Sequence, residues 1–127
     1  MSTELAQATF VSGLLRAAIE AGEGVLTLAE GLQPEDLQRS RLTRQALLTL
    51  LRDLGTAMTA VPPPARQAMP EIDWDGWLAL PRALQHNDTE QAHEALVMGV
   101  YSLVPATLLW FRVYQPQCPT WFSAPGG

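Results

Sequence analysis

The chain has 127 residues, 47% of them hydrophobic and 17% charged, a composition that excludes an intrinsically disordered protein and fits about one folded domain. Its net charge of −5 argues against a protein that coats nucleic acid non-specifically, because such binding needs a positive surface. Leu and Ala dominate and β-branched residues are sparse, so we predict an all-α fold.

The cysteine content and the first residues bear on the compartment of the protein. Cys118 is the single cysteine, which excludes an intrachain disulfide and makes a cysteine-based metal site implausible. The sequence MSTELAQATF lacks the charged-then-apolar order of a signal peptide. We therefore expect a cytoplasmic protein.

Residues 4–30 predict the first helix, whose apolar positions include Phe10, Leu14, Ala18, Val25 and Leu28. Gly22 and Gly24 weaken the middle of this helix and favour a bend there. Residues 31–33 form a break. Pro34 and the two acidic residues that follow it predict the first turn of a short helix.

Residues 41–61 have the clearest helical period in the chain. The prolines at 62–64 end this second long helix, since the residue before a proline resists the helical conformation. A short turn over 65–69 is expected next. The apolar face predicted for the second helix consists of Leu47, Leu50, Leu51, Leu54, Ala57, Met58 and Val61.

A third helix is predicted over 73–86 and a fourth over 88–114. Asp88 and Gln91 fit a capping box at the start of the fourth helix. Pro105 interrupts one backbone hydrogen bond in that helix and is expected to kink it.

The fourth helix contains a run without charge over 95–111, slightly shorter than the roughly 20 residues that span a membrane. We interpret it as a buried helix rather than a membrane span, placed at the centre of a bundle or in a subunit interface. The sequence thus predicts one antiparallel helical bundle over residues 1–115, and an irregular Pro- and Gly-containing tail over 116–127.

The order of these features resembles the HepT-like branch of the HEPN domains. The similarity covers about residues 10–114 and is most specific in PEIDW at 70–74, where family members commonly show Pro-Glu-Ile-x-Trp before a helix that ends in His. The helix QALLTLLRDLGTAMTAVP and the mid-helix proline of the last helix are also similar to the family. The resemblance implies a four-helix-bundle-like HEPN fold, a homodimer, and a minimal nucleotidyltransferase as antitoxin partner.

Family members that cleave RNA carry an Arg, four to six intervening residues, a His, and usually a Tyr two residues later. Counted from Trp74 without a gap, His86 stands at the family histidine position. Pro81 stands at the arginine position, so Arg82 is displaced by one residue, and Asp88 replaces the tyrosine. The resemblance implies a metal-independent endoribonuclease without a cofactor, in which His86 and Arg82 are the catalytic candidates.

The chemistry of these two residue types suits RNA cleavage. A neutral imidazole takes the proton of a ribose 2′-hydroxyl, and a guanidinium stabilises charge on the phosphoryl oxygens. On a regular helix, residues four apart lie on one face with about 5–6 Å between their Cβ atoms, which would bring Arg82 and His86 together.

Other features argue for a site that has lost its activity. The ring of Pro81 is expected to collide with the carbonyl group of Trp77 in an unbroken helix. The charge of Asp88 disfavours an RNA phosphate and is expected to pair with Arg82 or His86. In this interpretation His86 only ends its helix, where a cationic ring suits the dipole, and Arg82 pairs with Asp88 or with an earlier aspartate, Asp75.

Three hypotheses therefore remain open for the function. The first is the toxin-like ribonuclease of a two-component module, with RNA as substrate. The second is a non-catalytic dimeric helical domain that binds a nucleotidyltransferase partner or the substrate of that partner. The third is a purely structural helical dimer. Homodimerisation is also expected from the uncharged run of the last helix, which offers more apolar surface than one small bundle covers.

The remaining candidates favour structural roles. His93 has too few neighbouring ligands for a metal site and is interpreted as part of a solvated face. Trp74 and Trp77 could stack on bases, but core or interface anchors are the commoner role of such residues. Cys118 has no adjacent cation to activate its thiol. No metal and no cofactor is predicted.

Overall fold

The computed structural model describes residues 3–123, and every regular element in that range is a helix, which confirms the predicted all-α fold. The four long helical segments expected from the sequence are present, the last as one continuous stretch of three elements. The elements are α1 (Thr3–Ala29), α2 (Pro34–Arg39), α3 (Arg41–Ala60), α4 (Pro63–Ala68), α5 (Trp74–Leu84), α6 (Thr89–Met98), the π-helical turn η1 (Gly99–Leu103), α7 (Val104–Gln117) and α8 (Pro119–Phe122).

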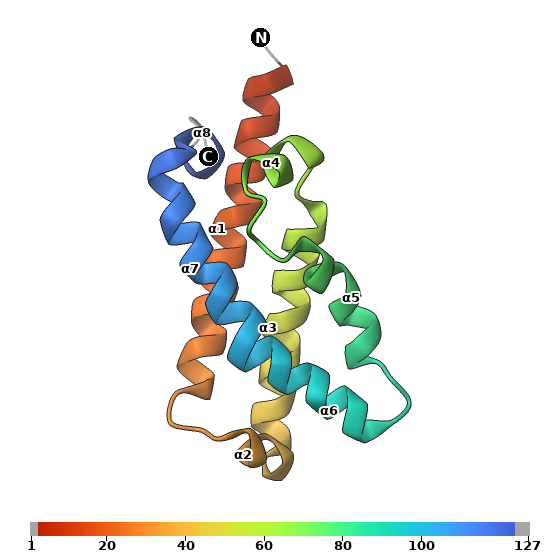
Figure 1. Cartoon of the computed structure of the whole chain (residues 1–127). Coiled ribbons are helices and arrows are strands. Elements are labelled where there is room, and N and C mark those ends of the chain that lie inside the picture. The colour runs from red at the N-terminus through yellow and green to blue at the C-terminus, as the bar shows by residue number, and fades with distance from the viewer. Residues whose placement is uncertain (1–2, 124–127) are drawn as a thin grey trace.

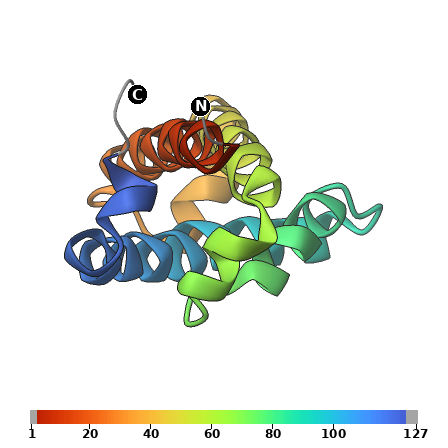
Figure 2. The same cartoon turned by 90° about the horizontal axis from the view of Figure 1, so that it is seen from above.

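The helices form two layers. Figure 1 shows α1 and α3 antiparallel to each other, with the continuous α6–η1–α7 stretch crossing in front of them and α5 running antiparallel to α6. Figure 2 shows α1 and α3 in one layer and α5, α6 and α7 in the other. The core lies between these layers and is built from the buried faces of α1, α3, α5 and α7.

The expected weak point of α1 is a close-packing site. The helix continues through Gly22 and Gly24. A β-carbon at Gly22 would lie 2.9 Å from Leu108 Cδ2 on α7, and one at Gly24 would lie 3.2 Å from Leu50 Cδ1 on α3. The absent side chains let α1 approach both of these neighbours, so Gly22 contributes to packing between the layers and Gly24 to packing within the layer of α1 and α3.

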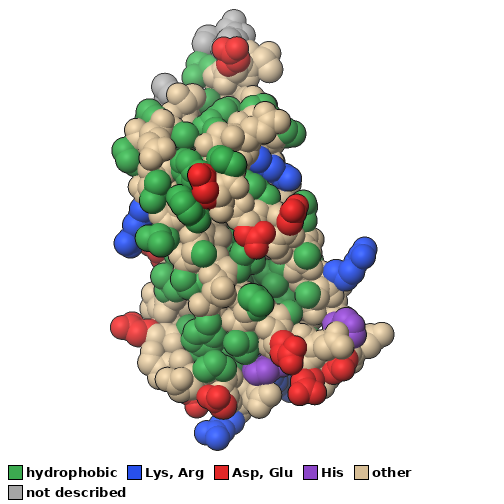
Figure 3. Space-filling model, viewed as in Figure 1, with side chains coloured by type: hydrophobic (Ala, Val, Ile, Leu, Met, Phe, Trp, Pro, Cys, Tyr) green, Lys and Arg blue, Asp and Glu red, His purple; other side chains and the backbone are tan. Residues whose placement is uncertain are grey.

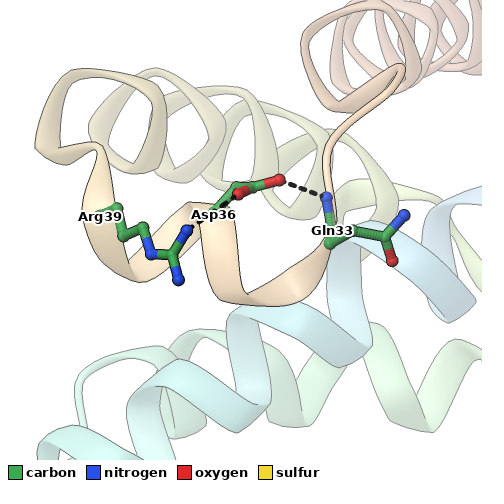
Figure 4. A network of polar contacts seen from close by, with 3 residues as sticks. All are labelled: Gln33, Asp36 and Arg39. Carbon is green, nitrogen blue, oxygen red and sulfur yellow. Dashed lines mark hydrogen bonds and ion pairs between the residues drawn. The ribbon is translucent and has the colours of Figure 1, made fainter.

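Polar contacts among Gln33, Asp36 and Arg39 stabilise α2 locally (Figure 4). The Gln33 backbone N–H donates to Asp36 Oδ2 at 2.8 Å, and Arg39 forms an ion pair with Asp36 at 3.9 Å. The hydroxyl group of Tyr101 donates to the carbonyl oxygen of Leu32 at 3.0 Å, which ties the preceding loop to η1. Burial of the hydroxyl group raises the pKa of Tyr101 above its ordinary value, and the negative charges of Asp36 and Glu35 on α2 raise this pKa further.

The second long helix ends as predicted, within one residue. All of its predicted apolar face is buried except Leu50, which is half-buried. Arg66 donates from Nε to the Val61 carbonyl oxygen at 2.7 Å and from Nη2 to the Thr59 carbonyl oxygen at 2.8 Å, which satisfies the free end of α3. The turn expected over 65–69 is instead the short helix α4, because Pro63 suits a first helical position.

Pro105 alters the last long helix without ending it. The preceding η1 turn widens the backbone spiral, and its closing hydrogen bond runs from the Val104 N–H to the Gly99 carbonyl oxygen. A π-helical turn is one way in which a helix accommodates a residue that lacks an N–H group. The stretch therefore runs on from α6 into α7, and the expected irregularity takes the form of a π turn.

The predicted irregular tail is wrong for much of its described part. α7 continues past Pro116, and α8 follows it. Phe122 is buried with its ring centroid 5.8 Å from that of Phe111, and the Ser12 hydroxyl group donates to the Phe122 carbonyl oxygen at 3.3 Å. Pro119 fits this helix because it occupies the first turn. Residues 124–127 of the predicted tail lie outside the described residues.

Among the described residues, one stretch, Thr89–Gln117, is long and apolar enough to cross a membrane by length and composition alone. In the structure its inner face packs into the core through Leu96, Val100, Val104 and Phe111. This packing is compatible with the predicted soluble protein. On its outer face, the side chains of Met98 and Leu109 are 61% and 62% exposed.

A buried hydrogen bond joins α5 to α7. Trp77 is completely buried, and its Nε1–H donates to the Thr107 hydroxyl oxygen at 3.0 Å. The same hydroxyl group donates to the Leu103 carbonyl oxygen at 2.7 Å. Thr107 thus uses both its donor and an acceptor, and the indole N–H has a partner in the core.

Replacing Thr107 by Val should lower the free energy of unfolding by about 1–3 kcal/mol, because the buried indole N–H of Trp77 loses its acceptor. Urea denaturation followed by circular dichroism measures the loss. The Thr107→Ser variant is the control, since it keeps the hydroxyl group and should retain most of the stability. Equal losses in the two variants would contradict this role of the hydroxyl group.

Candidate functional site

The residues of the PEIDW motif hold the start of α5 in place. The Asp73 carboxylate accepts a hydrogen bond from the Gly76 N–H at 2.9 Å and caps the helix. Trp74 donates from Nε1 to the Met69 carbonyl oxygen at 3.0 Å. The Arg66 guanidinium lies over the indole, with its Cζ 5.6 Å from the ring centroid of Trp74. Together with the buried side chain of Trp77, these contacts account for the tryptophans as anchors, as predicted, rather than as platforms for bases.

The structure does not place Arg82 and His86 on one helical face. α5 ends at Leu84, two residues before the predicted end, and His86 lies in the loop that follows. The final turn tightens because the Gln85 N–H bonds back to the Arg82 carbonyl oxygen at 3.2 Å. Pro81 lies inside α5 without breaking it. Both candidate side chains are exposed to solvent.

His86 makes a local hydrogen bond that affects its chemistry. Its Nδ1 accepts from the Asp88 backbone N–H at 3.0 Å. A neutral imidazole whose Nδ1 is an acceptor carries its proton on Nε2. In this tautomer Nε2 can donate a hydrogen bond but has no free lone pair to take a proton from a ribose hydroxyl. The loop geometry therefore opposes the role of general base.

Asp88 has a structural task that the sequence predicted in part. Its Oδ1 accepts from the Glu90 N–H at 2.9 Å and from the Gln91 N–H at 3.4 Å, which caps α6. Within residues 3–123 the ion pair between Arg39 and Asp36 is the one present, so the expected pairing of Arg82 with Asp88 or Asp75 is wrong. The Asp88 carboxylate bonds to the first backbone N–H groups of α6 and not to Arg82.

The remaining candidates are not assembled into a reactive cluster. Among the described residues, no group of three His, Cys, Asp or Glu side chains could hold a metal ion. His93 is half-buried beside Arg44, whose Nη1 already donates to the Leu37 carbonyl oxygen at 3.0 Å. Cys118 is a half-buried free thiol.

A groove that was not predicted from the sequence runs between α5 and the α6–η1–α7 stretch. We call this cavity of about 820 Å³ the α5–α7 groove. Small residues of both walls face it, namely Gly76, Ala79, Ala83, Ala95, Ser102 and Ala106. The acidic residues that line it are Asp73, Asp88, Glu90 and Glu94. Figure 3 shows hydrophobic side chains across the front of these helices.

The α5–α7 groove is lined by Asp88 but by neither Arg82 nor His86. Groove residues of the last helical stretch recur three to four positions apart, at Ala95, Met98, Ser102 and Ala106, a signal for one helical face. That signal alone could not reveal a groove, because the groove also depends on the angle at which α5 meets α6. The catalytic candidates and this groove are thus neighbours, not one site.

Comparison of the chain with protein-family models, with curated proteins and with solved structures finds no match. Similarity to the HepT-like family therefore stays a prediction from the residues quoted above.

The Asp88→Ala variant should lower the free energy of unfolding by about 1 kcal/mol, because two N–H groups at the start of α6 lose their acceptor. Thermal unfolding followed by circular dichroism measures the change. Asp88→Asn keeps a capping oxygen and should stay near wild type, and Arg82→Ala should have no effect. A loss of stability in Arg82→Ala equal to that in Asp88→Ala would show that the two side chains act as a pair.

Proposed function

We propose that this chain is a non-catalytic helical interaction domain of a cytoplasmic protein, and that the α5–α7 groove is its binding surface. The observation that carries the proposal is the groove itself, a largely apolar concavity of about 820 Å³ whose lining includes the exposed side chain of Met98. Apolar surface gathered on one face of a soluble protein commonly marks a binding site. On the HepT-like resemblance, the partner is a minimal nucleotidyltransferase.

The surroundings of His86 support binding rather than catalysis. The hydrogen bond to Nδ1 leaves the ring as a donor at Nε2. Asp88 and Glu90 lie in the same exposed segment, and their negative charge disfavours the approach of an RNA phosphate. Arg82 is the exposed cation nearest in sequence to these acidic residues.

Self-association, expected from the sequence, would use a different face, between α1 and α7. Leu26 and Leu109 are 41% and 62% exposed there and line a cavity of about 310 Å³. Glu23 and Arg112 line the same cavity. A two-fold contact is self-complementary when one patch carries both charges, because each copy can offer its Glu to the Arg of the other.

A metal-independent endoribonuclease is the second candidate function, with His86 as base and Arg82 as the stabiliser of phosphate charge. The exposure of both side chains favours it, because an RNA strand can reach them without a change in the fold. This activity would require His86 to release the Asp88 N–H and present a free nitrogen.

Purified wild-type protein, incubated with total RNA in EDTA, should cleave it no faster than the His86→Ala variant prepared identically. The reason is that the proposed domain has no general base at this position. Gel electrophoresis of the RNA measures the rates, and circular dichroism verifies that both proteins are folded. Cleavage by wild type alone would overturn the non-catalytic proposal and establish the ribonuclease.

Sedimentation velocity should find the wild-type chain as a dimer and the Leu109→Glu variant as a monomer, because the new carboxylate would be buried in the proposed two-fold contact. Leu42→Glu is the matched control. Leu42 is 86% exposed on α3 and does not line the cavity between α1 and α7, so its variant should remain dimeric. A monomeric wild type, or dissociation of both variants alike, would rule out this interface.

A further inference from the structure

The charged residues that line the α5–α7 groove are all acidic. Glu90 and Glu94 lie on the first turns of α6, and Asp88 caps that helix. Asp73 caps the start of α5, which runs antiparallel to α6 and so places its charge toward the other end of the groove (Figure 1). Among residues 3–123, no Arg or His side chain lines the groove. Negative charge therefore flanks an apolar floor at both ends.

The shape of the groove suits a helix. One wall extends along the chain from Asp88 to Ala106, which at 1.5 Å per helical residue is about 27 Å, or five turns. Alanine, glycine and serine make up much of both walls, so the backbone of an incoming helix can approach closely. Met98 lines the middle of the groove with a flexible side chain that adapts to different apolar partners.

We propose that the α5–α7 groove binds a basic amphipathic helix of a partner protein. The apolar face of that helix, with residues at i, i+3, i+4 and i+7, packs on the small residues of the floor. Its Arg or Lys side chains reach the carboxylates of Asp73, Asp88, Glu90 and Glu94. This inference rests on the proposed function and adds to it the chemical class of the partner.

Charge also distinguishes this occupant from two others. A second copy of the chain placed on the groove by a two-fold axis would bring the same acidic residues together, and like charges in contact oppose association. An anionic membrane surface would be repelled in the same way. A cationic helix gains from the acidic residues that disfavour both of these alternatives.

The test uses the full-length protein and three labelled synthetic peptides of 18 residues. The first has Leu on one helical face and Lys and Arg on the other. The second is its scramble, with the same composition and no apolar face, and the third replaces its cations by Glu. Fluorescence anisotropy should show binding of the first peptide that is at least about tenfold tighter than that of either control. Equal binding of the first peptide and its scramble would overturn the inference, because charge alone would then explain it.

Two pairs of substitutions locate the site. Glu90→Gln with Glu94→Gln should weaken binding of the basic peptide several-fold at low salt. Glu20→Gln with Glu30→Gln, the same change of charge on exposed positions of α1 and its end, should leave binding unchanged. Ala95→Trp should abolish binding by filling the groove, with circular dichroism as the control for folding. Equal effects of the two charge-neutral pairs would overturn the site.

The outcomes separate this inference from the proposed function. Binding of the acidic peptide alone, blocked by Ala95→Trp, would overturn the basic partner and retain the groove as a binding surface. If Ala95→Trp converts a wild-type dimer to a monomer, the occupant is a second copy and the inference fails. If no peptide binds and Ala95→Trp leaves self-association unchanged, the inference and the groove's proposed function fail together.

Discussion

The hydrogen bond from the buried indole of Trp77 to the hydroxyl group of Thr107 constrains the second layer of the bundle. It joins α5 to the beginning of α7 inside the core, where an unpaired N–H would be costly. The Thr107 hydroxyl group in turn donates a hydrogen bond to the Leu103 carbonyl oxygen in η1. The separation of α5 from the last helical stretch, and therefore the width of the groove between them, depends on this buried contact.

The PEIDW motif also fixes the position of α5, through contacts at the start of that helix. Asp73 caps α5, while Trp74 is held by the Met69 carbonyl oxygen and the Arg66 guanidinium. Arg66 also satisfies the carbonyl groups at the end of α3. One arginine thus links the end of one long helix to the beginning of the next, and the most recognisable stretch of the sequence is accounted for by packing and capping.

Helix positions could be predicted from the sequence where local chemistry decides them. Periodic leucines placed α3, and Asp88 with Gln91 placed the start of α6. The end of α5 was missed, because no strong stop signal separates Leu84 from His86 and only backbone contacts tighten the turn. The α8 helix was missed because its stability comes from burial of Phe122, a tertiary contact. Arg82 and His86 do not form the predicted helical pair because α5 ends before His86. The groove could not be predicted because it depends on the angle between α5 and α6, which residue spacing does not encode.

The π turn before Pro105 also fixes a rotational register. Five residues of η1 form this widened turn, and groove positions precede and follow it on the same exposed side. Each residue of a regular helix turns the chain by about 100°. A π turn holds one residue more than an α-helical turn, so loss of one residue within η1 would restore a regular spiral and keep α7 close to its present register. Loss of a second residue would swing all of α7 by about that angle relative to α6. Thr107 would then leave the indole of Trp77 and Ala106 would leave the groove wall, so a second deletion is tolerated far less here than in the loops at either end.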